Sequence, residues 1–277
     1  NIMANGKIAM KLDDGDQLIG VQTCTEDEDI MLAADSGKSI RFPVTDVRVF
    51  SGRTSTGVRG IRLAAGQKIV SMTTLNHIEL ETDIRDAYLR MSKAQRRQEG
   101  DEDDNGADEA AAAVNGENTQ IALSEEEFEK LAETEEFILS VTENGYGKRT
   151  SAYEYRITKR GGQGVVNITT EGRNGPVAAS FPVEDSDQIM LVTNGGKIIR
   201  SPVADIRIAG RSTQGVTLFD TAENEQVVSV AHLKETDGDN DPGDGGETNT
   251  DATDARAADE TPADIDDDEV DDAAGDA

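Results

Sequence analysis

The chain has 277 residues, with 27 basic and 56 acidic side chains, a formal net charge of -29, and 4% aromatic residues without tryptophan. So few aromatic residues argue against one large hydrophobic core and favour several small ones. The charge excludes a uniformly basic nucleic-acid binder, and the lone Cys24 excludes a disulfide or a cysteine-based metal framework within the chain.

Residues 1–75 are predicted to form half a blade and one complete blade of an all-β repeat protein. Apolar and polar residues alternate over 8–12 before the turn residues 13–16, which predicts a β-hairpin. A complete unit follows over 30–42, with two strands joined by a turn, and Pro43 ends their pairing. With the short apolar stretches that come next, each unit supplies about four strands, as a propeller blade does.

Residues 76–136 interrupt the β pattern with an acidic insertion. Apolar residues at helical spacing predict a helix over 82–97, and the acidic, alanine-rich stretch 100–116 is expected to be disordered. Ser124, followed by three glutamates, predicts the N-cap of a second helix.

Residues 137–232 are predicted to form two further blades, and residues 233–277 an acidic, disordered tail. The acidity is concentrated outside the blades. Residues 233–277 hold 18 acidic and 2 basic side chains, and residues 76–136 hold 19 acidic and 6 basic ones. Of the 56 acidic and 27 basic side chains in the whole chain, 19 of each therefore remain for the blades. The blades are therefore neutral overall, which keeps DNA binding open.

The sequence shows neither a signal peptide nor an apolar run long enough to span a membrane, and it does not begin with methionine. We therefore expect a fragment of a longer cytoplasmic protein. It is expected to begin inside a repeat, because Gly6 and the residues after it match Gly57 and the residues after it.

One unit recurs with a period of roughly 50 residues. Its marker residues return in the same order: Gly37, Lys38, Arg41, Pro43, Asp46 and Arg48 in one copy, and Gly196, Lys197, Arg200, Pro202, Asp205 and Arg207 in the last. A copy between these two places Gly145, Arg149 and Arg156 at the matching positions. Repeats of this length that are rich in β-branched residues favour blades over helical solenoids.

Basic residues recur at matching places in the copies, and we predict that they bind the DNA backbone along one rim. They are Lys38, Arg41, Arg48, Arg53, Lys148, Arg149, Arg156, Lys159, Arg160, Lys197, Arg200, Arg207 and Arg211. No base-reading pattern is evident, so shape-tolerant binding is expected. The alternative is that these cations merely solvate an outer face, with Asp46 and Asp205 as ion-pair partners.

The sequence TKRGGQG, residues 158–164, is a candidate phosphate-binding loop, because two cations precede three glycines; an ordinary glycine loop between strands is the alternative. His77 and His232 are interpreted as incidental. Residues 237–248 begin like a calcium loop but lack its glycine and glutamate, so no metal site or catalytic residue is predicted.

Three stretches resemble the C-terminal domain of the DNA gyrase A subunit: NGYGKRTSAYEY at 144–155, the segment 187–216, and GVRGIRL at 57–63. The resemblance implies a β-pinwheel, six-bladed in the parent, that wraps double-stranded DNA. The parent would be a bacterial A2B2 heterotetramer with the gyrase B subunit, using ATP and magnesium to introduce negative supercoils. No tyrosine of this chain lies in the motif of the family's nucleophile, and the family's hallmark box, QRRGGKG, is absent.

Two alternatives to gyrase stay open. One is the matching domain of topoisomerase IV, and the other is a protein-binding propeller, for which neutral blades and acidic arms are adequate. We further hypothesise that the acidic tail competes with DNA for the basic rim, so that removing residues 233–277 tightens DNA binding at low salt.

Overall fold

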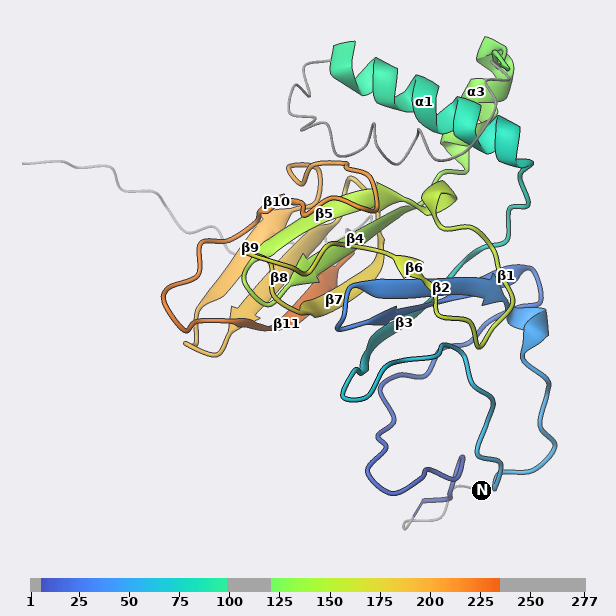
Figure 1. Cartoon of the computed structure of the whole chain (residues 1–277), viewed down its shortest axis with the longest axis vertical. Helices are drawn as coiled ribbons and strands as arrows, with labels where there is room; N and C mark the ends of the chain where they lie inside the picture. Colours follow the sequence, from blue (N-terminus) through green and yellow to red (C-terminus); the bar gives the residue numbers. More distant parts are fainter. Residues whose placement is uncertain (1–5, 99–120, 235–277) are drawn as a thin grey trace, which may run out of the picture. The chain divides into compact units, whose positions relative to one another are not determined.

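The computed structural model describes residues 6–98 and 121–234. The stretch 100–116 and nearly all of the acidic tail, both expected to be disordered, lie outside these residues. Within them the protein is mostly β, with three antiparallel sheets (Figure 1). None of the helices in the described part is long and apolar enough to cross a membrane.

The sheets come from three repeats, which we define by their strands as repeat 1 (28–76), repeat 2 (137–183) and repeat 3 (188–233). The strands are β1 (Glu28–Ala34), β2 (Lys38–Pro43) and β3 (Ile69–Asn76) in repeat 1; β4 (Phe137–Thr142), β5 (Tyr146–Ser151), β6 (Val165–Val166) and β7 (Val177–Val183) in repeat 2; and β8 (Gln188–Thr193), β9 (Ile198–Pro202), β10 (Val216–Thr217) and β11 (Val227–Leu233) in repeat 3.

Each complete sheet borrows its fourth strand from the following repeat. The first sheet has the order β3-β1-β2-β6 and the second β10-β5-β4-β7, so β6 and β10 leave their own repeats. Figure 1 shows β6 beside β2, although they are far apart in the sequence. The third described sheet, β11-β8-β9, has three strands. Neighbouring repeats are thus joined by strand exchange, and we call each junction a seam.

The hydrophobic core is divided into small clusters, as the scarcity of aromatic residues predicts. One cluster joins repeats 2 and 3 through Leu139 and Leu191, among others. A second joins repeats 1 and 2 through Met31 and Ile138, and a third lies around Phe42 in repeat 1. Because two of the clusters cross a seam, hydrophobic burial holds neighbouring repeats together.

The two helices predicted in the insertion are present as α1 (Thr82–Gln98) and α3 (Glu125–Glu133). Ser124 caps α3 with a complete capping box. The buried Tyr88 of α1 packs edge-to-face on Tyr153 of repeat 2, with ring centroids 5.4 Å apart, and donates a hydrogen bond to Glu135 at 2.7 Å. Burial raises the pKa of the Glu135 carboxyl.

The β-hairpin predicted near the N-terminus is not formed: residues 6–27 contain no strand, although a turn joins Asp13 and Asp16. Its apolar residues stay exposed, Ile8 at 68% and Val21 at 79%. Among the described residues, none of the sheets includes any part of 6–27. Two short strands without a sheet to join are unstable in water, which explains the difference.

Candidate nucleic-acid interface

Arg41, a predicted DNA contact, lies in the interior and joins repeats 1 and 2. It is 4% exposed, and its Nε donates to Asp29 Oδ2 at 2.7 Å. Its Nη atoms donate to the carbonyl oxygens of Ala152 at 2.9 Å and Asn76 at 2.8 Å. Ala152 opens the 3-10 turn η2 (Ala152–Glu154) of repeat 2. The guanidinium therefore links repeats 1 and 2 by hydrogen bonds across the seam. This corrects the prediction that Arg41 contacts DNA.

Arg149 links repeats 2 and 3 in the same way. It is 6% exposed, donates to the carbonyl oxygens of Ile206 at 2.6 Å and Ala204 at 3.1 Å, and pairs with Asp185. These carbonyls belong to the turn of repeat 3 that matches η2. Arg41 and Arg149 occupy equivalent positions and donate to carbonyl oxygens at the equivalent turn of the next repeat. The recurrence of this basic residue therefore reflects the packing of one repeat on the next.

Lys148 is fully buried, and its ammonium group donates to the carbonyl oxygens of Gly210 and Arg211 and to Thr213 Oγ1. A buried charge is tolerated only with such partners. Lys148, Arg41 and Arg149 are therefore no longer candidate DNA contacts, because all three side chains are buried and cannot reach a phosphate.

The glycine loop 158–164 is also part of a seam. Its Thr158 N–H donates to Arg41 O at 2.9 Å, and its Gly161 N–H donates to Gly60 O, so these backbone donors are occupied within the protein. Gly164 has φ +73°, and a Cβ there would overlap the carbonyl oxygen of Ser39. The glycines permit close approach of two repeats, so the second interpretation, an ordinary structural loop, is favoured.

Other predicted cations are divided between neighbouring repeats and solvent. Arg160 is half-buried and donates to Asp46 O at 2.9 Å, and Arg211 is half-buried and donates to Val166 O at 2.7 Å. Both reach back to the preceding repeat. Lys197 pairs with Glu225 at 2.6 Å. Its ammonium group, with the Ala222 N–H, lowers the pKa of Glu225 to about 2.

The remaining predicted cations are accessible. Lys38, Arg48, Arg53, Arg156, Lys159 and Arg200 are exposed, and Arg207 is half-buried. Most of them lie at the end of the sheets that carries the 3-10 turns. Lys38 and Lys197 instead lie at the opposite end, beside the β-hairpin turns. Lys38 begins β2 and Lys197 directly precedes β9, whereas the 3-10 turn or its counterpart follows the end of each strand. One rim therefore does not collect all the predicted residues.

Two cations near the accessible set were missed by the sequence analysis. Arg59 and Arg62 are exposed on the segment that leads from the loop of repeat 1 towards β3. The run GVRGIRL, residues 57–63, contains both arginines directly after the closing glycine Gly57. This pair of cations in one exposed segment was the signal that could have identified them. Arg59, Arg62, Arg48 and Arg53 all belong to the loop that joins β2 to β3.

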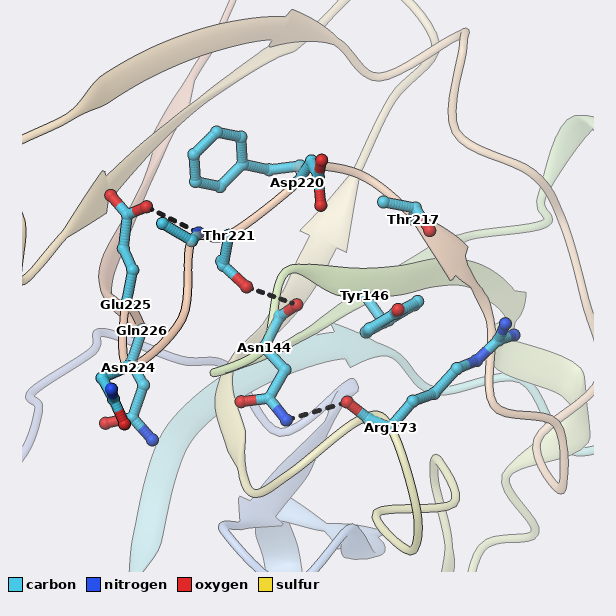
Figure 2. Close-up of a pocket in the computed structure, with 11 residues that line it drawn as sticks. Asn144, Tyr146, Arg173, Thr217, Asp220, Thr221, Asn224, Glu225 and Gln226 are labelled. Carbon is cyan, nitrogen blue, oxygen red and sulfur yellow. Dashed lines mark hydrogen bonds between the residues drawn. The ribbon is translucent and has the colours of Figure 1, made fainter.

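A pocket of about 500 Å³ lies at the hairpin end of repeats 2 and 3 (Figure 2). Asn144 donates to Arg173 O at 2.8 Å and accepts from Thr221 at 3.5 Å. Arg173 stacks 4.8 Å from the centroid of the Tyr146 ring. Because acidic side chains, Glu225 among them, share the lining with this one arginine, the pocket does not favour a polyanion.

Both histidines have acidic partners, contrary to the interpretation that they are incidental. His77 Nδ1 lies 2.7 Å from Asp29 Oδ1, and His232 Nε2 lies 2.6 Å from Asp187 Oδ2. Asp29 therefore contacts both His77 and Arg41. No cluster of histidine, cysteine, aspartate and glutamate suited to a metal ion occurs among the residues that the structure describes.

Comparison with known proteins identifies related sequences. The family model described as DNA gyrase C-terminal domain, beta-propeller, matches residues 3–25, 28–76, 136–184 and 187–234. The DNA gyrase A subunit of Granulibacter bethesdensis is 50% identical over 249 residues, which cover 88% of this chain and 26% of that protein. The same protein of Rickettsia bellii is 46% identical over 86% of this chain and 25% of its own length. The chain thus spans about a quarter of these relatives.

Solved structures share the fold. The structure of a DNA gyrase A C-terminal domain aligns with a TM-score of 0.57 and 21% sequence identity, over 83% of this chain and 59% of that chain. The C-terminal domain of a DNA topoisomerase IV aligns with a TM-score of 0.56 and 21% identity, over 82% of this chain and 53% of that chain. At this identity the two neighbours establish the β-pinwheel architecture alone.

Proposed function

Because the chain belongs to the DNA gyrase C-terminal domain family, we propose that it binds and wraps double-stranded DNA as part of the DNA gyrase A subunit. The complete protein acts with the gyrase B subunit in an A2B2 heterotetramer. That cytoplasmic type II topoisomerase uses ATP and Mg²⁺ to introduce negative supercoils. This chain contributes DNA binding, and the catalytic tyrosine, ATP and Mg²⁺ belong to other parts of the complex.

The observation that carries this proposal is the exposure of cations after successive 3-10 turns. Arg48 follows η1 (Val44–Asp46) in repeat 1, and Arg156 follows η2 in repeat 2; both are exposed. Lys159 is exposed three residues further on. Side chains at equivalent places on successive repeats offer a phosphate backbone a cation at each step, and each neutralised phosphate releases counterions.

The two alternatives make different predictions. A topoisomerase IV domain shares the fold, whereas the relatives that are 44% to 50% identical are DNA gyrase A subunits, which favours gyrase. A protein-binding propeller requires no DNA affinity. It also predicts that the exposed arginines can be replaced without changing any interaction with DNA.

The test is the salt dependence of DNA binding, measured by fluorescence anisotropy with a labelled duplex. Each phosphate contact contributes about -0.9 to the slope of log K against log salt. The double variant Arg156→Ala/Lys159→Ala should therefore lower the magnitude of the slope by about 2. A control variant with the same change in charge, Lys68→Ala/Lys130→Ala, removes exposed lysines beside the β1–β2 turn and on α3, and should keep the slope.

Two results would contradict the proposal. Equal slopes for the double variant and the control would show that the cations after the 3-10 turns do not contact phosphates. Absence of binding by the unaltered chain at low salt would favour the protein-binding propeller.

A further inference from the structure

The insertion is acidic as a whole, but its helix α1 is basic. Five of the six basic side chains of residues 76–136 lie on α1, and the sixth lies on α3. The two acids of α1, Asp83 and Asp86, stand in its first five residues, so the stretch 89–98 carries four cations and no acid. This half of the helix therefore has a single sign of charge, which attracts a ligand of the opposite sign.

The cations of this stretch are divided between two sides of α1. Arg96 is half-buried on the side that packs on repeat 2, and it donates to Ser92 Oγ at 2.6 Å. Burial raises the pKa of the Glu135 carboxyl on that side, and the charge of Arg96 partly offsets the rise. Arg96 therefore contributes to the packing of the insertion and not to its outer surface.

Arg90 and Arg97 lie on the outer side of α1 and are exposed. They are seven residues apart, close to two helical turns, so they share one face, and the helical rise places them about 10 Å apart along the axis. Lys93 lies between them on the same face and is half-buried. The Nη2 atom of Arg90 donates to the carbonyl oxygen of Ile121 at 3.1 Å, and the side chain stays exposed. We call Arg90, Lys93 and Arg97 the outer stripe.

The packing of α1 on α3 and repeat 2 fixes the place of this stripe (Figure 1). Tyr88 is 1% exposed, and its ring centroid lies 5.4 Å from that of Tyr153 in η2 and 5.0 Å from that of Phe128 in α3. Tyr153 in turn donates to the carbonyl oxygen of Leu131 in α3 at 3.0 Å. Arg156 follows Tyr153 by three residues, which span at most about 11 Å. The stripe is thus held on the turn that precedes an exposed cation of the proposed DNA-binding surface.

We propose that the outer stripe of α1 is a second contact surface for the phosphate backbone of the duplex DNA that binds the cations after η2. This inference rests on the proposed function and adds to it a surface outside the repeats. A stripe of about 10 Å covers about three phosphate steps of one strand, at about 3.4 Å each. A protein partner is less suited, because large apolar side chains, on which protein interfaces centre, are absent from the exposed positions of this stretch. Those positions are Arg90, Ala94, Gln95, Arg97 and Gln98.

The experiment measures the salt dependence of binding of the whole chain to a labelled duplex by fluorescence anisotropy. Arg90→Ala/Arg97→Ala removes two charges of the stripe, whereas Arg90→Lys/Arg97→Lys keeps them. Lys68→Ala/Lys130→Ala is the matched control, because it removes the same charge and Lys130 belongs to the same insertion. Circular dichroism of each variant reports whether α1 stays helical.

Arg90→Ala/Arg97→Ala should lower the magnitude of the slope of log K against log salt by about 2, with about 0.9 for each phosphate contact, and should leave the circular dichroism spectrum unchanged. The lysine variant and the control should keep the slope. A slope equal to that of the control would overturn the inference, because the two arginines would then serve only the C-terminal end of the helix. A slope that falls together with the helical signal would also overturn it, since loss of α1 would explain the change.

The variant Arg156→Ala/Lys159→Ala, measured in parallel, separates this inference from the proposed function. If it lowers the slope while Arg90→Ala/Arg97→Ala does not, the outer stripe does not contact DNA and the proposed function stands. If the unaltered chain does not bind DNA at low salt, both are refuted.

Discussion

Replacing Arg41 by alanine should destabilise the protein far more than replacing its counterpart Arg200. Arg41 is 4% exposed and pairs at 2.7 Å with Asp29, which is 0% exposed. Removing one partner of a buried ion pair costs about 3–5 kcal/mol, because the other charge stays buried, and among the described residues Asp29 would keep only its contact with His77. Arg200 is exposed and contacts the side chain of Gln188, so its loss should cost about 0–1 kcal/mol.

Urea denaturation followed by circular dichroism measures both effects. Since domains are stable by about 5–15 kcal/mol, Arg41→Ala should lower the midpoint substantially, while Arg200→Ala should leave it nearly unchanged. Folded Arg41→Ala protein should keep the salt slope of DNA binding, because Arg41 does not reach a phosphate. Equal destabilisation by the two substitutions, or a slope reduced by about 0.9 with stability unchanged, would refute the reasoning.

Two further substitutions test the seam and an ion pair. Gly164→Ala should lower the melting temperature more than Gly66→Ala, because both glycines have positive φ but only the first faces a carbonyl, that of Ser39; equal shifts would contradict this. The folded pKa of Glu225 is lowered to about 2, below an unfolded value of about 4.3, so its stabilisation is present above the unfolded pKa and is lost as the pH falls towards 2. Glu225→Gln should be less stable at neutral pH and should lose that part of the acid dependence, whereas identical acid-denaturation curves would contradict the assignment.

The sequence predicted where helices and strands form better than it predicted which strands pair with each other. Helical spacing predicted a helix over 82–97 close to its observed bounds of 82–98, because the insertion is locally regular. Strand exchange was not predictable from the period. The pair Val165–Val166 belongs to repeat 2 in sequence but joins the sheet of repeat 1, and that choice depends on tertiary packing.

The candidate site was predicted only in part, since a basic residue that recurs with a structural period has two explanations. Arg41 and Arg149 recur because each binds the turn of the next repeat. Arg48 and Arg156 recur with the same spacing and remain exposed. Periodicity alone does not separate the two pairs, because burial at the seam depends on the neighbouring repeat. Arg59 and Arg62 were overlooked for a different reason: they have no basic counterpart in the other repeats.

The most direct test of the central proposal is ligation of nicked plasmid in the presence of the chain, followed by analysis of the topoisomers on a gel. If the exposed cations of successive repeats bend DNA around the protein, the linking number should shift, and the shift should be smaller with Arg156→Ala/Lys159→Ala than with Lys68→Ala/Lys130→Ala. An unshifted linking number at saturating DNA binding would contradict wrapping by this chain.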